Sequence, residues 1–535
     1  MNIAASVRSI IPDGHSLNVE ELCTAARDSG CKIKLSAEIR QRVKASRALL
    51  DSFVEAGRII YGVNTGVGGF VNWLIPPSMA SEVQHNILRS VQSNVGPSLD
   101  DDHVRAAMLA RINSLGRGCS AIALENLEKY VAIYNRGVVP CIPEKGSLGT
   151  SGDLGPLACI ALVGTGEWRA RYEGEILSGA EALARAGIEP MQLSYKEGLA
   201  LVNGTSVMTG MAACLVADAQ RLLKAHTLAS CMSLEVLKAK IMPYHPAAHA
   251  QKPHPGQVRF AECVYRTLAD SKMIVQDHEV EQWLHKLAGD KPRGLDEQIE
   301  DAYSIRAGPQ IIGPVIDTLS FVQQTVETEL NSSNDNPLIV VDDGDAVHNA
   351  NFHGQYIANA MDQLAIVLVN LCNLSERRNN RLLNPNLNGD LPPFLVNENP
   401  GQRLGLMGGQ FMATSLTAEC RQMSMPMSVQ SLPSTGDFQD HVSFGLNAAR
   451  RTRDILHNSY HILAFELICA CQAADIRGVE RLSSATRQLH AEVRRVVPYL
   501  DHDEPLTDYI EAVAEQYRTG ALCAAIPSDV AAYEW

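Results

Sequence analysis

Residues 357–374, IANAMDQLAIVLVNLCNL, decide the fold class. On a helix, their apolar residues occupy more than one stripe, and a helix that is apolar nearly all round is buried among other helices. A helix of about 35 residues reaches about 50 Å, which is longer than one small globule needs. The same texture fills four long segments, residues 205–242, 310–330, 356–383 and 442–476. The sequence therefore predicts a mainly all-α protein with a central bundle of long helices.

Changes in Gly/Pro content and in the length of the helical patterns divide the chain into three regions. Residues 1–204 contain short helical patterns broken by Gly/Pro-rich stretches such as YGVNTGVGGFVN, residues 205–485 carry the long helices, and residues 486–535 read as a C-terminal helical cap. Two assemblies fit the long helices: one large monomeric bundle, or a bundle shared between subunits. We favour the shared bundle.

Composition excludes several classes of protein. The chain has 535 residues, 46% of them apolar, and a formal net charge of -14, which disfavours a nucleic-acid partner. Its 13 cysteines are odd in number and irregularly spaced, so free thiols in a reducing compartment are expected. Cys469 and Cys471 lie in an apolar helical run, where cysteine packs as a small hydrophobe. With no apolar leader in MNIAASVRSIIPDGHS, we expect a cytoplasmic protein that does not span a membrane.

The stretch GTSGDLGP, residues 149–156, admits two interpretations. Ser and Asp cap helices well, so the buried helix LGPLACIALVG could follow them. Alternatively, the Gly152 nitrogen could attack the Thr150 carbonyl in a compressed turn, and dehydration of Ser151 would then leave a methylidene on an imidazolone ring. Glycine suits so tight a backbone. A nucleophile elbow would require G-x-S-x-G after a strand, which this stretch does not match.

The segment GSLGTSGDLGPLA resembles the signature of the histidine/phenylalanine/tyrosine ammonia-lyase family, which forms 4-methylideneimidazol-5-one (MIO) in this way. The family more often has Ala where Thr150 stands, but that side chain takes no part in cyclisation. The similarity runs from about Tyr61 to about Glu480. It implies the ammonia-lyase fold, a homotetramer whose active sites are each built from three chains, and MIO made autocatalytically from Thr150, Ser151 and Gly152.

The resemblance assigns catalytic roles to residues that are unremarkable by themselves. Tyr61 begins YGVNTGVGGF, which does not fit a phosphate-binding G-x-G-x-x-G; in the family this is the mobile loop over the site, and its tyrosine removes the β-proton. An ordinary tyrosine pKa near 10 makes a poor base, so the site would have to favour phenolate. Asn203, otherwise a turn residue, would hydrogen-bond the imidazolone.

A second set of residues would hold the substrate. Tyr303 and Arg306 are three apart, hence neighbours on a helix. The resemblance implies that Arg306 binds the substrate carboxylate with its guanidinium fork and that Tyr303 lies by the reacting centre. Asn336 resembles the carboxylate-side asparagine of the family, and Phe352 an aromatic wall near the cofactor.

The predicted pocket for the substrate side chain is mostly apolar. Phe438 and Gln439 follow in STGDFQDHVSF; histidine enzymes of the family usually have Glu where Gln439 stands, so histidine is the weaker substrate. An apolar end leaves a buried hydroxyl unpaired at a cost of roughly 1–3 kcal/mol, which favours phenylalanine. Ser90 keeps tyrosine open. The apolar walls are expected from Ile87, Val91, Leu199, Met407 and Phe411.

Three histidines in HPAAHAQKPHPG, His245, His249 and His254, suggest zinc at first sight. Prolines break the helix that an i, i+4 pair requires and H-E-x-x-H is absent, so we expect no metal.

The runs EKGSLGTSGDLGPLA, RLGLMGGQFM and MPMSVQSL look most like bacterial phenylalanine 2,3-aminomutases. The resemblance implies conversion of L-phenylalanine to β-phenylalanine through an MIO-bound amine and cinnamate, with some ammonia-lyase activity. Phenylalanine or tyrosine ammonia-lyase and tyrosine 2,3-aminomutase stay as alternatives, because the choice depends on how long the acrylate is held. A catalytically inactive helical scaffold is the non-enzyme alternative.

Overall fold

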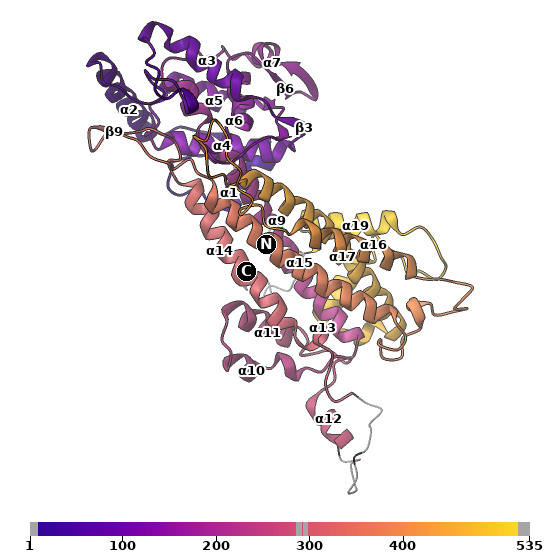
Figure 1. Cartoon of the computed structure of the whole chain (residues 1–535). Coiled ribbons are helices and arrows are strands. Elements are labelled where there is room, and N and C mark those ends of the chain that lie inside the picture. Colours follow the sequence, from indigo (N-terminus) through magenta and orange to yellow (C-terminus); the bar gives the residue numbers. More distant parts are fainter. Residues whose placement is uncertain (1–8, 285–291, 293–297, 523–535) are drawn as a thin grey trace. The chain divides into compact units, whose positions relative to one another are not determined.

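The computed structural model describes residues 9–284, 292 and 298–522, and most of them are helical (Figure 1). They form two compact units. The first comprises residues 1–217, 322–362 and 426–450, and the second residues 218–321, 363–425 and 451–535. These units differ from the predicted regions 1–204, 205–485 and 486–535, because each unit is assembled from segments far apart in the chain. Residues 523–535 of the predicted cap lie outside the described residues.

The long helices confirm the predicted mainly α-helical fold. Their ends are set by backbone conformation. The helix predicted over residues 205–242 ends at Val236, shortly before Lys238 takes a φ of 53°, and the one predicted over 442–476 begins after Phe444, whose φ is 54°. Every unit boundary except that near residue 425 falls inside one of these helices, so each unit holds part of all four. The four are α9 (Ser206–Val236), α14 (Gly308–Leu330), α15 (Gln355–Leu383) and α17 (Gly445–Arg477).

Short helices and strand pairs make up the rest of the first unit. Strand β1 (Ser9–Ile10) pairs in parallel with β2 (Lys32–Ile33). Antiparallel pairs are β3 (Val95–Ser98) with β5 (Pro143–Lys145) and β8 (Leu338–Val340) with β9 (Asp345–Val347). In a three-stranded sheet, β6 (Arg169–Tyr172) pairs antiparallel with β4 (Val139–Pro140) on one side and with β7 (Glu175–Ser178) on the other. The helices are α1 (Val19–Arg27), α2 (Ala37–Glu55), α3 (Ala80–Val91), α4 (Asp101–Gly116), α5 (Leu124–Arg136), α6 (Leu154–Gly164), α7 (Gly179–Ala186) and α8 (Glu197–Val202).

Three of these helices, α3, α6 and α8, contact one another in pairs. Helix α6 is apolar on every face and all of it but Leu154 is buried, as a central helix must be. Helix α3 buries Ala80, Gln84, Ile87 and Leu88, the spacing of a single face. This packing brings the end of α3, the start of α6 and the end of α8 together.

The second unit is a helical bundle with a buried polar centre. Arg378 on α15 donates to the Ser230 hydroxyl on α9 at 2.7 Å and lies 3.5 Å from Glu466 on α17, which accepts from Ser233 on α9. Arg378 and Glu466 are fully buried, so the three helices converge on this cluster. Shorter helices complete the unit: α10 (Pro246–Ala250), α11 (Pro255–Thr267), α12 (Asp277–Leu284), α13 (Tyr303–Arg306), α16 (Met407–Met423), α18 (Ser484–Val493) and α19 (Thr507–Thr519).

Two further predictions concern apolar helices. Cys469 and Cys471 are fully buried free thiols on α17, which confirms core packing. Among the described residues, α15 is the one helix long and apolar enough to cross a membrane, and 72% of its most apolar window is buried within the protein. Such burial is that of a core helix.

Candidate functional site

The stretch Thr150–Gly152 lies between β5 and α6. The predicted helix LGPLACIALVG is α6 itself, and Asp153 occupies its N-cap position without capping it. The Asp153 carboxylate instead accepts hydrogen bonds from the Ser147 hydroxyl at 2.9 Å and from the Met208 N–H at 2.7 Å. Complete burial raises the pKa of Asp153 to about 7 despite these donors.

Gly152 approaches the backbone of Gly204 so closely that no other residue fits. Its φ is 71°, and an added Cβ would lie 2.0 Å from the Gly204 carbonyl oxygen. The Asp153 N–H donates to the same oxygen at 2.8 Å, which holds the backbone segments at Gly152 and Gly204 side by side. A left-handed, side-chain-free residue at this point fits the compressed turn that the predicted ring closure requires.

Two amides meet Ser151. The Asn203 Nδ2 donates to the Ser151 carbonyl oxygen at 3.1 Å, and the Gln439 Nε2 donates to the Ser151 hydroxyl at 3.0 Å. Gln439 is held by a two-way backbone pairing with Ser434. Residues predicted to act together from three distant parts of the sequence therefore converge on one serine.

Tyr61 lies on the same cavity. Its hydroxyl accepts a hydrogen bond from the Gly68 N–H at 3.0 Å, and its own N–H donates to the His348 Nε2 at 3.3 Å. Burial raises the pKa of Tyr61 above its usual 10, and the Gly68 N–H offsets only part of this rise. These contacts therefore disfavour phenolate, although the base role that the resemblance implies for Tyr61 would require it.

A cavity of about 970 Å³ in the first unit unites these groups. Its lining includes Ser151 shortly before α6, Leu154 at the start of α6, and the loop residues Thr65, Val67–Val71 and Thr435–Gly436. The predicted residues that line it are Tyr61, Ile87, Ser90, Val91, Ser151, Leu199, Asn203, Asn336, Phe352, Phe438 and Gln439.

One wall of the cavity is apolar. Ile87 and Val91 project from α3 and Leu199 from α8, and Ile87 and Leu199 are 6% and 5% exposed. Ser90 is the hydroxyl on this wall, and it donates to the Ile87 carbonyl at 3.1 Å. The Ser90 oxygen can therefore still accept a hydrogen bond, but its proton is already donated to Ile87.

The other predicted residues belong to the second unit. Tyr303 and Arg306 form the predicted helical pair on α13, with the guanidinium 5.1 Å from the ring centre, and Arg306 pairs with Glu300 at 2.7 Å. Both line a pocket of about 740 Å³. Met407 and Phe411 project from α16 into another pocket of about 720 Å³.

Two of the three histidines in HPAAHAQKPHPG, His245 and His249, have structural partners. His249 is buried, with one ring nitrogen 2.9 Å from the Pro243 carbonyl and the other 3.0 Å from the Gln257 amide. His245 instead caps α10 by accepting from the Ala247 N–H. Over residues 9–284, 292 and 298–522, one group, Asp100, Asp102 and His103, has metal-ligand spacing, but Asp102 already pairs with Arg27 at 3.1 Å.

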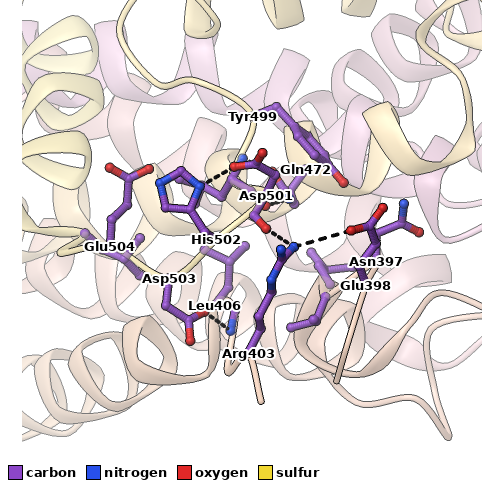
Figure 2. Close-up of a pocket in the computed structure, with 15 residues that line it drawn as sticks. Asn397, Glu398, Arg403, Leu406, Gln472, Tyr499, Asp501, His502, Asp503 and Glu504 are labelled. Carbon is purple, nitrogen blue, oxygen red and sulfur yellow. Dashed lines mark hydrogen bonds and ion pairs between the residues drawn. The ribbon is translucent and has the colours of Figure 1, made fainter. Parts of the chain in front are cut away.

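Figure 2 shows a smaller pocket of about 150 Å³ in the second unit. The Arg403 guanidinium meets the Asp501 carbonyl and the Glu398 carboxylate, and the Asp503 carboxylate accepts from the N–H groups of Leu404 and Gly405 at 2.8 Å each. Arg403 and Asp503 thus connect the loop of residues 398–405 with the loop of residues 501–503.

Three residues of the cavity region were not predicted from sequence: Asp153, His348 and Arg111. Arg111 is fully buried on α4 and donates to the Asn203 carbonyl at 2.9 Å. An arginine inside the apolar run AAMLARINSL was the available signal, because a charge there is buried and must be paired. Nothing comparable marks His348.

Known proteins are similar to this chain over most of its length. A family model described as aromatic amino acid lyase matches residues 17–495. A tyrosine ammonia-lyase of Cupriavidus metallidurans is 43% identical, covering 95% of this chain and 96% of that protein, and a tyrosine 2,3-aminomutase of Chondromyces crocatus is 40% identical, covering 90% and 91%. The structure of Pantoea agglomerans phenylalanine aminomutase matches with a TM-score of 0.93 and 52% identity, covering 95% of this chain and 98% of that one.

Proposed function

The chain belongs to the aromatic amino acid lyase family, and from that premise we propose that it is a phenylalanine 2,3-aminomutase with some ammonia-lyase activity. Enzymes of this family are ammonia-lyases and aminomutases that act on aromatic amino acids and depend on MIO. The reaction would move the amino group of L-phenylalanine from Cα to Cβ, and escaping intermediate would leave as cinnamate and ammonia. The likeness to the Pantoea enzyme and the apolar wall of Ile87, Val91 and Leu199 support phenylalanine.

Thr150, Ser151 and Gly152 would form the cofactor. When formed, the ring supplies an electrophilic methylidene carbon for the substrate amine. The observation that carries this proposal is the contact set of the tripeptide: Gly152 lies against Gly204 where no Cβ fits, and the Asn203 amide lies on the Ser151 carbonyl. That carbonyl would become the ring oxygen, so a donor there draws electron density from the ring.

Other side chains would bind the substrate and move its protons. Gln439 would present a neutral amide, and Phe352 and Phe438, which line the cavity, would present aromatic surface to the substrate ring. Tyr61 would remove the β-proton, and its raised pKa has to be lowered in the assembled site. A guanidinium such as that of Arg306 is suited to both this effect and carboxylate binding.

We assign Arg306, Tyr303, Met407 and Phe411 to the same site as contributions from other copies in a homotetramer. Large exposed aromatic side chains support an assembly that covers them: Tyr303 is 72% and Phe411 68% exposed. Mixing Ser151→Ala with Arg306→Ala subunits after mild dissociation tests this. Activity regained in the mixture supports shared sites. A mixture as inactive as its components, with exchange of subunits verified, would refute sharing.

Product analysis tests the reaction. The purified protein is incubated with L-phenylalanine and with L-tyrosine, and the products are separated. β-Phenylalanine in excess of cinnamate is the expected result. Ser151→Ala is the matched control: it should be inactive and should lack the mass deficit of two water molecules that the wild-type protein shows. A wild-type mass without that deficit would sink the cofactor assignment.

An ammonia-lyase is the second candidate, favoured by the identity shared with the Cupriavidus tyrosine enzyme. Free arylacrylate without β-amino acid would select it, and a preference for tyrosine would select the tyrosine enzymes. An inactive scaffold predicts no product from either substrate and no effect of Ser151→Ala.

A further inference from the structure

The strongest unassigned feature near the cavity is a charge buried one layer behind it. The Arg111 guanidinium on α4 is fully buried and donates to three oxygens: the carbonyls of Ala200 and Asn203, the latter at 2.9 Å, and the Asn334 side chain at 3.2 Å. Burial disfavours the charged form of Arg111 and so lowers its pKa, while the nearby charge of Asp335 favours the charged form. Burial of an arginine is costly, so its contacts are what retain it.

Two of the oxygens that Arg111 contacts lie at the C-terminal end of helix α8. The last carbonyls of a helix have no partner within it, and the C-terminal end carries partial negative charge. Arg111 supplies N–H donors and positive charge to the carbonyls of Ala200 and Asn203 at that end. It therefore fixes where α8 stops, and Asn203 is the residue at which it stops.

The Arg111 guanidinium also packs against Gly204. An added Cβ on Gly204 would lie 2.4 Å from the Arg111 Nη1 and 2.4 Å from the Asn334 Oδ1. On its other side, Gly204 lies against Gly152 and accepts from the Asp153 N–H. Arg111, Gly204 and Gly152 are thus stacked in contact, and no side chain fits between them.

We propose that Arg111 is the positioning residue for cofactor formation and for the Asn203 hydrogen bond. Through Gly204 it presses the chain against Gly152, and through the Asn203 carbonyl it sets that side-chain amide on the Ser151 oxygen. In the ring closure the Gly152 nitrogen bonds to the Thr150 carbonyl carbon. That oxygen leaves as water with the protons of the Gly152 and Ser151 N–H groups, so that a C=N bond to the Ser151 nitrogen replaces the C=O bond. Ser151 then loses its Cα proton and hydroxyl as a second water, which leaves the methylidene. Arg111 touches none of these atoms and acts only through residues 203 and 204.

This inference rests on the proposed MIO chemistry. Its test compares Arg111→Met with a matched variant of the same helix, Arg105→Met. Arg105 is also buried on α4 and also caps a helix end, donating to the carbonyls of Ala25, Ala26 and Asp28 at the end of α1. Both variants remove a buried guanidinium from helix-end carbonyls, but Arg105 has no contact with the residues around Ser151 among those that the structure describes.

The readouts are intact mass, thermal unfolding and steady-state kinetics. Arg111→Met should leave a large fraction of chains without the two-water deficit, and in the chains that carry it kcat should fall at least about tenfold while KM changes less than about threefold. Arg105→Met should lower the unfolding temperature similarly and keep the full deficit. In a double-mutant cycle, Asn203→Ala should lower kcat by nearly the same factor with or without Arg105, and by a much smaller factor in the Arg111→Met background.

If Arg111→Met does not fold, Arg111→Lys decides, because an ammonium keeps the charge but cannot reach the three oxygens as a fork does. It should show the same partial loss of the mass deficit. A full deficit and unchanged kcat in Arg111→Lys, or in folded Arg111→Met, would overturn the proposal. Equal loss of deficit in Arg105→Met would also overturn it, since the effect would then be general destabilisation. A wild-type protein without the deficit would refute the proposed function instead.

Discussion

Val91 at the end of α3 offers a direct test of what selects the substrate. It lines the cavity beside Ile87 and Leu199, which are nearly fully buried. Val91→His places a ring with both donor and acceptor capacity on this apolar wall. We expect the change to move selectivity from phenylalanine toward tyrosine.

The size of the effect follows from the hydroxyl that tyrosine adds. Against an apolar wall an unpaired buried hydroxyl costs about 1–3 kcal/mol. Ser90 donates its proton to the Ile87 carbonyl but can still accept one, so the lower part of that range applies. A cost of about 1–2 kcal/mol makes wild-type kcat/KM roughly 5- to 30-fold higher for phenylalanine than for tyrosine. A histidine partner should remove most of this cost and bring the ratio to about 3 or below.

The assay measures kcat/KM for both substrates from the appearance of arylacrylate plus β-amino acid. Val83→His is the matched control, since it makes the same replacement on the same helix at a residue that does not line the cavity. It should leave the ratio unchanged. A Val91→His ratio equal to or above that of the wild type would refute the argument that this wall sets selectivity.

Three further predictions concern residues around Ser151. Burial raises the pKa of Asp153 from 3.8 to about 7, so the stabilising effect of its protonated carboxyl is complete below pH 3.8 and is lost as the pH rises to 7. The free energy of unfolding of Asp153→Asn should therefore increase relative to that of the wild type by about 1.4 kcal/mol per pH unit from pH 5 to 7, and the difference should level off above pH 7. Denaturant unfolding at fixed protein concentration measures this, and a difference that does not vary with pH contradicts it. Tyr61→Phe should lower kcat at least about 100-fold by removing the base while keeping the two-water mass deficit, and loss of the deficit would assign Tyr61 another role. Gln439→Glu places a carboxylate where an amide meets the Ser151 hydroxyl at 3.0 Å, and should lower kcat/KM for phenylalanine about tenfold and raise turnover of histidine; unchanged kinetics with both substrates would exclude Gln439 from substrate contact.

The site was predictable from sequence as far as residue identity carries chemistry. Ring closure needs a Ser-Gly pair, which Ser151 and Gly152 provide, but a helix cap explains these residue types as well, and the resemblance along the chain is what favoured the ring. Tyr61, Asn203 and Gln439 were expected through resemblance, and the fold brings them to one cavity. The requirement for phenolate at Tyr61 could not be checked in sequence, because a pKa depends on burial and on neighbours from other parts of the chain.

The sequence by itself determined the long helices, because helix formation depends on local periodicity and side chains within a few residues of each other. Even their ends shifted where single residues such as Lys238 adopt positive φ. Only the tertiary structure decided that Gly204 must be side-chain-free on two sides and that Arg111 lies behind it. Arg111 and Asn334 are 223 positions apart, and no local pattern encodes a contact made by packing between segments so distant. The proposed electrophile thus needs only three consecutive residues, while the surroundings that would compress them exist only once the chain has folded.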